Sequence, residues 1–106
     1  MIIACDFDNV IHDQKNPIPV RRMGGVIEGT EDALRKLKRK GHTIIVHTVW
    51  GDEKGKQTIA DFMKYYHLPY DSITNEKPRA DCYLDDKAVR FTNWNQSLND
   101  ILNGGK

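Results

Sequence analysis

The sequence is poor in the features that mark secreted, membrane and nucleic-acid-binding proteins. It has only two cysteines, Cys5 and Cys82, so at most one disulfide could form and the fold must rely on an ordinary core. No run approaches the roughly 18 apolar residues that a membrane span needs. The 16 Lys and Arg nearly balance the 15 Asp and Glu, which excludes the strongly basic surface of a general nucleic-acid binder. We therefore expect a cytoplasmic protein that binds neither membranes nor nucleic acids in general.

Length and complexity limit the domain organisation. A chain of 106 residues has room for one core, and no internal repeat or low-complexity segment divides it. We expect a single domain over residues 1–106, in which 103–106 form a frayed tail.

Two apolar runs near the N-terminus predict buried strands separated by a helix. Residues 2–7 form a short apolar run bounded by polar residues, and residues 43–48 form another that is rich in β-branched side chains, as buried parallel strands are. Between them, Thr30 is the expected N-cap of a helix that ends before Gly41, with Leu34 and Leu37 facing inward.

The rest of the chain continues this alternation. A helix is predicted at 56–67 from the inward stripe Ile59, Phe62, Met63 and Tyr66. Short strands are predicted at 70–73, 80–84 and 88–91, and a final helix is expected to turn Leu98, Ile101 and Leu102 inward. The pattern predicts an α/β fold of three layers, Rossmann-like, with a parallel sheet of about five strands and helices on both faces. Functional sites of such sheets lie at the carboxyl ends of the strands.

Two pairs of carboxylates occupy such strand ends. Asp6 and Asp8 close the first strand, and Asp85 and Asp86 follow the strand that ends at Leu84. Carboxylates that converge at one edge repel one another unless a cation neutralises them, and a hard ion such as Mg²⁺ prefers oxygen ligands. The alternative is that each Asp is a turn-former or a helix cap.

Two more residues at strand ends suit phosphate chemistry. Thr48 ends the run TIIVHT, and Lys77 lies in NEKPRAD, before the strand that carries Asp85. A hydroxyl and an ammonium group can both hold the non-bridging oxygens of a phosphoryl group. His47 precedes Thr48, and Cys5 precedes Asp6, so alternation along each strand is expected to turn both to the opposite face as packing residues.

The ordered segments IIACDFDNV, IIVHT, EKP and CYLDD resemble the four signature segments of the haloacid dehalogenase-like phosphohydrolase superfamily. The stretch KPRADCYLDDKAVRF is similar to the ending of small hydrolases of bacterial and phage type that lack a cap domain. The resemblance covers nearly the whole chain. It implies a Mg²⁺-dependent phosphatase that works through an aspartyl-phosphate.

The resemblance also implies a role for each matching residue. Asp6 is the expected nucleophile and Asp8 the general acid and base, while Thr48 and Lys77 grip the phosphoryl oxygens. Asp6, Asp85 and the backbone carbonyl of Asp8 are the expected metal ligands, and Asp86 would orient the water shell of the ion or Lys77.

The sequence departs from the pattern of the family in two places. Asn9 stands where Gly is commonest, although Asn tolerates left-handed backbone and can both keep the loop and contact substrate. Trp50 stands two residues after Thr48, where the family often has Arg or Asn, and it either packs or stacks on a substrate ring.

The loops leave no room for a cap domain. Only residues 9–29 separate the first strand from the first helix, so they are expected to form a flap rather than a domain. The open site would accept a phosphorylated substrate on a bulky carrier, or a partner subunit of a homo-oligomer would close it. Arg21 and Arg22 in the flap either approach an anionic substrate or are ordinary surface charges.

Two other functions compete with the phosphatase hypothesis. A receiver-like phospho-acceptor module also gathers Asp, Thr and Lys at strand ends, but it carries its acidic pair on the first strand and its phosphorylated Asp on the third. Here the D-x-D motif comes first and the acidic pair follows Lys77. The other alternative is a catalytically idle domain that binds a partner through the same fold.

Overall fold

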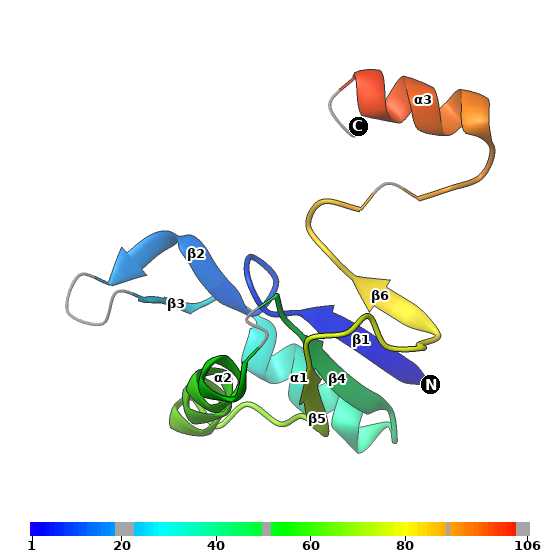
Figure 1. The fold of residues 1–106 in the computed structure, drawn as a ribbon. Helices are drawn as coiled ribbons and strands as arrows, with labels where there is room; N and C mark the ends of the chain where they lie inside the picture. Colours follow the sequence, from blue (N-terminus) through cyan, green and yellow to red (C-terminus); the bar gives the residue numbers. More distant parts are fainter. Residues whose placement is uncertain (19–22, 50–51, 89, 104–106) are drawn as a thin grey trace.

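A four-stranded parallel sheet forms the centre of the protein (Figure 1). The computed structural model describes residues 1–18, 23–49, 52–88 and 90–103. The strand order is β5-β4-β1-β6, with every neighbouring pair parallel. The strands are β1 (Ile2–Asp6), β4 (Thr43–His47), β5 (Ser72–Thr74) and β6 (Cys82–Leu84).

The two central strands, β1 and β4, are the longest of the sheet, with 5 residues each. Ile3, Ala4 and Cys5 of β1 are buried in succession, so both faces of this strand are covered. Ile44 and Val46 are fully buried on one face of β4. The register pairs β1 with β4 from Ile2 and Thr43 to Asp6 and His47, which aligns the carboxyl ends of the two strands.

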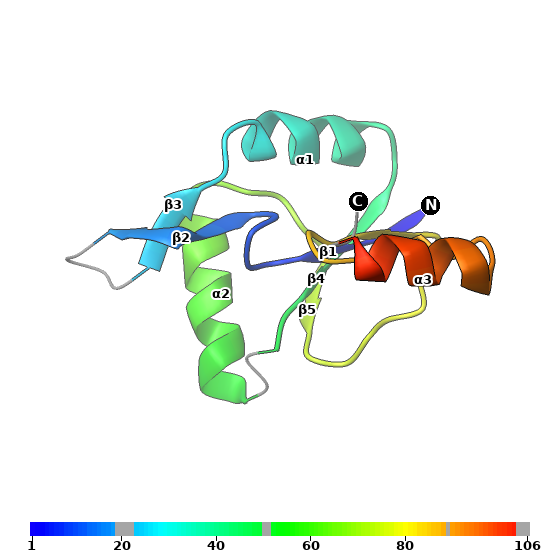
Figure 2. The same ribbon diagram turned by 90° about the horizontal axis from the view of Figure 1, so that it is seen from above.

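Helices α1 (Thr30–Arg39) and α2 (Glu53–Tyr65) cover opposite faces of the sheet, as Figure 2 shows. The predicted inward residues of both helices are confirmed: Leu34 is buried and Leu37 half-buried in α1, and Ile59, Phe62 and Met63 are buried in α2. The chain therefore has the predicted α/β architecture of three layers.

The helix starts differ from the prediction. Thr30 is the first residue of α1 rather than its N-cap, and Gly29 occupies the cap position with a left-handed φ of 89°. Glycine has no Cβ, so it adopts this conformation without steric cost. Helix α2 begins three residues earlier than predicted because the Asp52 side chain caps it, accepting a 2.7 Å hydrogen bond from the Gly55 N–H.

An antiparallel hairpin of β2 (His12–Ile18) and β3 (Met23–Val26) lies between β1 and α1, within the predicted flap. Ile11, just before β2, is buried in the core, and Val26 of β3 packs against the core. Arg21 and Arg22 lie outside the described residues, as does Trp50.

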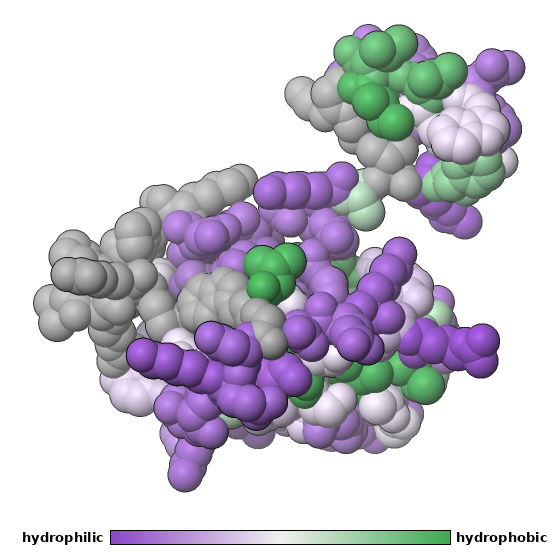
Figure 3. All heavy atoms as spheres, viewed as in Figure 1, coloured by the Kyte–Doolittle hydropathy of each residue, from purple (hydrophilic) through white to green (hydrophobic). Residues whose placement is uncertain are grey.

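The C-terminal part of the chain departs most from the prediction. In the described part of 88–91, Ala88, Arg90 and Phe91 form no strand, so the sheet has four strands rather than about five. Helix α3 (Trp94–Leu102) forms, but it stands apart from the sheet (Figure 1). Its apolar residues Leu98, Ile101 and Leu102 are 51%, 58% and 80% exposed rather than turned inward. Apolar atoms accordingly gather on its surface in Figure 3.

The separate position of α3 also enlarges the molecule. The radius of gyration is 15.0 Å, compared with about 13 Å for a compact chain of this length. Helical spacing specifies which side of a helix is apolar, but it does not specify a surface that covers that side, which is why the expectation for α3 was wrong. None of the helices in the described part of the chain is both long and apolar enough to cross a membrane.

Candidate active site

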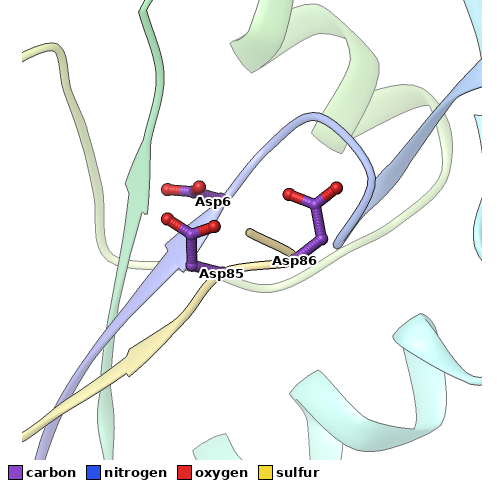
Figure 4. A group of neighbouring side chains, drawn as sticks. All are labelled: Asp6, Asp85 and Asp86. Atoms are coloured by element: carbon purple, nitrogen blue, oxygen red, sulfur yellow. The ribbon is translucent and has the colours of Figure 1, made fainter. Parts of the chain in front are cut away.

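Three carboxylates from distant parts of the chain meet at the carboxyl edge of the sheet. Asp6 is the last residue of β1, and Asp85 and Asp86 directly follow β6. One ligand oxygen of each lies within 4.8 Å of the others. Figure 4 shows the Asp6 and Asp85 carboxylates side by side, with Asp86 next to them. These three residues are called the acidic cluster below.

Strand register creates this cluster. Parallel pairing sets Cys5 of β1 opposite Leu84 of β6, so the residues that follow, Asp6 and Asp85, become neighbours where both strands end. The Asp85 side chain also accepts a 2.7 Å hydrogen bond from the Lys87 N–H, which ties the carboxylate into the turn after β6.

Asp6 lies in the most perturbed environment of the cluster. Desolvation raises the pKa of its carboxyl group, and the neighbouring Asp85 adds to the rise. A hydrogen bond from His47, whose Nδ1 lies 3.1 Å from Asp6 Oδ1, acts in the opposite direction and lowers the pKa of Asp6. A cation bound between Asp6 and Asp85 would favour the ionised form in the same way.

His47 corrects one prediction from the sequence. Alternation along the strand was expected to turn it away from the site, but it contacts Asp6. The parallel register pairs His47 directly with Asp6, and paired residues of neighbouring strands point to the same face. The expectation for Cys5 is confirmed, because its side chain is buried in the core.

Asp8 stands outside the acidic cluster and has its own partner. Its Oδ1 lies 2.8 Å from Nδ1 of His12, a residue that the sequence analysis did not connect with the site. Asp8 nevertheless lines the same pocket as the cluster. Asp8 and His12 are four residues apart, a spacing that brings side chains together on a helix. Here Asp8 lies in a loop and His12 begins β2 instead, so this spacing alone does not predict their contact.

Asn9 adopts the left-handed conformation that the sequence analysis considered for it, with φ of 64°. Its N–H donates a 2.6 Å hydrogen bond to the His12 carbonyl, which closes the loop after β1. Its side-chain Oδ1 is buried without a hydrogen-bond partner among the described residues, and Asn9 lines the pocket. Asn9 is therefore beside the space that a bound group would occupy.

The pocket at this edge has a volume of about 370 Å³. It is lined by Asp6, Asp8, Asp85 and Asp86, together with Asn9, His47 and Thr48. Thr48 directly follows β4 and is buried, and its backbone N–H donates to the Thr74 carbonyl at 3.0 Å. Asp85 and Asp86 are exposed at the rim.

Lys77 lies beside this pocket rather than in its wall. It lines an adjoining depression of about 290 Å³ together with Asp6, His47 and Asp85. Its ammonium group lies over the ring of Tyr83, 4.9 Å from the centroid. The structure thus brings Lys77 to the edge of the acidic cluster, on the side of β6.

Comparisons with known proteins support the fold. No family model matches the chain, and no curated protein matches it. Among solved structures, the chain is similar to a conserved protein from Bacteroides thetaiotaomicron, with 22% sequence identity and a TM-score of 0.66. The similarity covers 97% of this chain and 90% of the other. The fold and the site define a Rossmann-like α/β protein with a carboxylate-rich pocket at the carboxyl edge of its sheet.

Proposed function

We propose that this protein is a Mg²⁺-dependent phosphohydrolase of the haloacid dehalogenase-like type, which cleaves phosphomonoesters through an aspartyl-phosphate on Asp6. The observation that carries the proposal is the acidic cluster, in which the end of β1 meets the turn after β6 within 4.8 Å. Thr48 and Asp8 line the same pocket, and Lys77 lines the depression beside it.

The donor set fits a small, hard cation. The acidic cluster offers only carboxylate oxygens, and its exposed rim leaves space for the water ligands that Mg²⁺ retains. When bound, the ion would lower the repulsion between an anionic nucleophile and an anionic substrate. Asp6 and Asp85, with the Asp8 carbonyl, are the residues proposed to hold it, and the position of Asp86 within the cluster suits contact with its water shell.

The side chains supply the two chemical steps. A carboxylate oxygen of Asp6 attacks phosphorus while the bond to the leaving oxygen breaks, and Asp8 gives that oxygen its proton. Asp8, now ionised, takes a proton from the water that attacks the acyl phosphate, which releases inorganic phosphate and restores Asp6. Thr48 and Lys77 hold the non-bridging oxygens throughout.

The sheet topology argues against the receiver-like alternative. Numbered in chain order, the four parallel strands are arranged 3-2-1-4, so the first strand lies between the second and the fourth. A receiver domain has the order 2-1-3-4-5, in which the first strand lies between the second and the third. In the order 3-2-1-4, the strand that ends in D-x-D lies directly beside the strand that leads to the acidic pair.

The proposal is tested by following phosphate release from an aryl phosphate, with Mg²⁺ and with a chelator. We expect hydrolysis by the wild type only with Mg²⁺ and none by Asp6→Asn. Asp61→Asn is the matched control, because it removes the same charge from an exposed position on α2. Equal rates for the wild type and Asp6→Asn, or no hydrolysis by either, would overturn the catalytic claim.

We propose that the substrate is a phosphomonoester on a bulky carrier. Asp85 and Asp86 are exposed, so the described part of the pocket rim is open rather than closed around a small molecule, and an open rim leaves room for the carrier. A panel of sugar, nucleotide, phosphopeptide and nucleic-acid-end phosphates would identify the carrier. The same measurements would detect a dependence on protein concentration if a second copy completes the site.

A further inference from the structure

The His12 side chain occupies a closed, aromatic position directly beneath Asp8. It is only 3% exposed. Its ring stacks on Phe7, with centroids 5.0 Å apart and planes within 10°, and it meets the edge of Phe62 at 5.4 Å. A ring held on two sides in this way has little freedom to change its rotamer.

Both ring nitrogens of His12 are hydrogen-bonded, and the partners determine which nitrogen carries the proton. The Gly24 N–H from β3 donates to Nε2 at 2.8 Å, so Nε2 is the acceptor. Nδ1 therefore carries the proton in the neutral ring and donates to Asp8 Oδ1 at 2.8 Å. This tautomer is assigned from the hydrogen-bond network.

The backbone around His12 is also closed. Its N–H donates to the Phe7 carbonyl at 2.8 Å, and its carbonyl accepts from the Asn9 N–H at 2.6 Å. The loop that carries Asp8 is thus fixed at both ends to the residue whose ring contacts the Asp8 carboxyl group. Precise placement of a reacting group depends on such locked supporting contacts.

From these contacts we propose that His12 is a positioning residue, which holds Asp8 by Oδ1 so that Oδ2 delivers the proton to the leaving group. The inference rests on the proposed function. Because Oδ1 accepts from His12, a proton on the Asp8 carboxyl group is placed on Oδ2, the oxygen that remains available to substrate. His12 itself touches neither substrate nor metal ion in this role.

The test compares two substrates that differ in their need for a proton. An alkyl phosphate expels a strongly basic oxygen and needs a general acid, whereas p-nitrophenyl phosphate expels a weakly basic one and hardly needs it. His12→Phe keeps an aromatic ring between Phe7 and Phe62 but has no donor. We expect it to lose roughly tenfold or more in kcat/KM, which reports formation of the aspartyl-phosphate, on the alkyl phosphate and little in kcat/KM on p-nitrophenyl phosphate.

Two further variants separate positioning from general damage to the fold. His12→Asn places an amide donor near the position of Nδ1 and should restore much of the rate on the alkyl phosphate. In an Asp8→Asn background, His12→Phe should cause no further loss. Equal losses of kcat/KM by His12→Phe on both substrates, or no loss on either, would overturn the positioning role.

A spectroscopic measurement keeps this inference distinct from the proposed function. In the wild-type protein, nitrogen-15 NMR should show His12 with a protonated Nδ1 and an unprotonated Nε2, and Asp8→Asn should shift the Nδ1 resonance. The opposite tautomer, or no response to Asp8→Asn, would overturn the inference even in an active enzyme. Absence of Mg²⁺-dependent hydrolysis by the wild type would instead overturn the proposed function and, with it, the role in proton delivery.

Discussion

Replacing Asp85 by Asn should raise the stability of the ion-free protein and remove most of the stabilisation that Mg²⁺ gives. The substitution deletes one charge from the acidic cluster but keeps a side-chain oxygen that can accept from the Lys87 N–H. Its effect on stability should therefore come mainly from electrostatics rather than from a lost hydrogen bond.

The magnitude follows from the geometry of the cluster. At 4.8 Å, the upper limit of the separations, two unit charges repel by about 0.9 kcal/mol in bulk water and about 3.5 kcal/mol at an effective dielectric constant of 20. Asp85 and Asp86 are exposed, so the lower value is the better guide. Relief of two such repulsions gives about 1 to 2 kcal/mol, or a rise in Tm of roughly 4 to 8 °C.

Mg²⁺ should reverse the order of the two proteins. An ion present at a hundred times its Kd stabilises the folded state by about 2.7 kcal/mol, which exceeds the gain from removing Asp85. Thermal melting followed by circular dichroism, in chelator and in a Mg²⁺ series, measures both effects. Asp61→Asn is the control, because it removes a charge on α2 and should leave the Mg²⁺ response unchanged. Melting curves of Asp85→Asn that match the wild type in chelator and shift equally with Mg²⁺ would refute the reasoning.

Two further predictions concern parts of the protein away from the pocket. Burial raises the pKa of the Cys5 thiol to about 11, so iodoacetamide at pH 8 should alkylate the half-buried Cys82 well before Cys5; equal labelling rates by peptide mass spectrometry would contradict this. Hydrogen bonds from the Lys38 ammonium and the Ile44 N–H lower the pKa of Asp71 in the folded protein. The stability that these bonds give is fully present above the pKa of Asp71 in the unfolded chain, about 3.9. It is lost as the pH falls through the lower pKa of Asp71 in the folded protein. Lys38 and Asp71 are each about a third exposed, so Asp71→Asn should cost only about 1 kcal/mol in urea unfolding at pH 7. This cost should shrink as the pH is lowered below about 3.9. A stability difference between the two proteins that stays constant with pH would disprove the account.

Much of the fold followed from local patterns in the sequence. The apolar runs around Ile3 and Ile44 identified the central strands, and the spacing of Leu34 and Leu37 identified the inward face of α1. These patterns are reliable because burial on both faces of a parallel strand, or on one side of a helix, constrains every residue of the element.

The errors occurred where one residue or one distant surface decides the outcome. The start of α1 depends on a single left-handed glycine, Gly29, although Thr30 is also a good cap by type. The expected strand at 88–91 was weak, and its described residues continue as irregular chain beyond β6. The placement of α3 depends on a covering surface that no periodicity specifies.

The candidate site, like the fold, could be predicted from the sequence only in part. Placing carboxylates at the ends of β1 and β6 required only the rule that parallel strands share a carboxyl edge. Finding His47 beside Asp6 required the register between β1 and β4, which the sequence does not specify directly. Finding His12 beneath Asp8 required the conformation of an irregular loop.

The central position of β1 has a consequence for how the protein folds during synthesis. This strand is translated before the other three strands of the sheet. Its contact with β4 spans 41 residues at Asp6 and His47, and its contact near β6 spans 79 residues at Ile2 and Asp81. Ordering such distant pairings incurs loop-closure entropy before their contacts form, so the sheet should assemble slowly and late. Until residues 82–84 have been synthesised, β1 lacks its β6 neighbour and exposes unpaired backbone groups along that edge, which is the kind of edge at which aggregation begins.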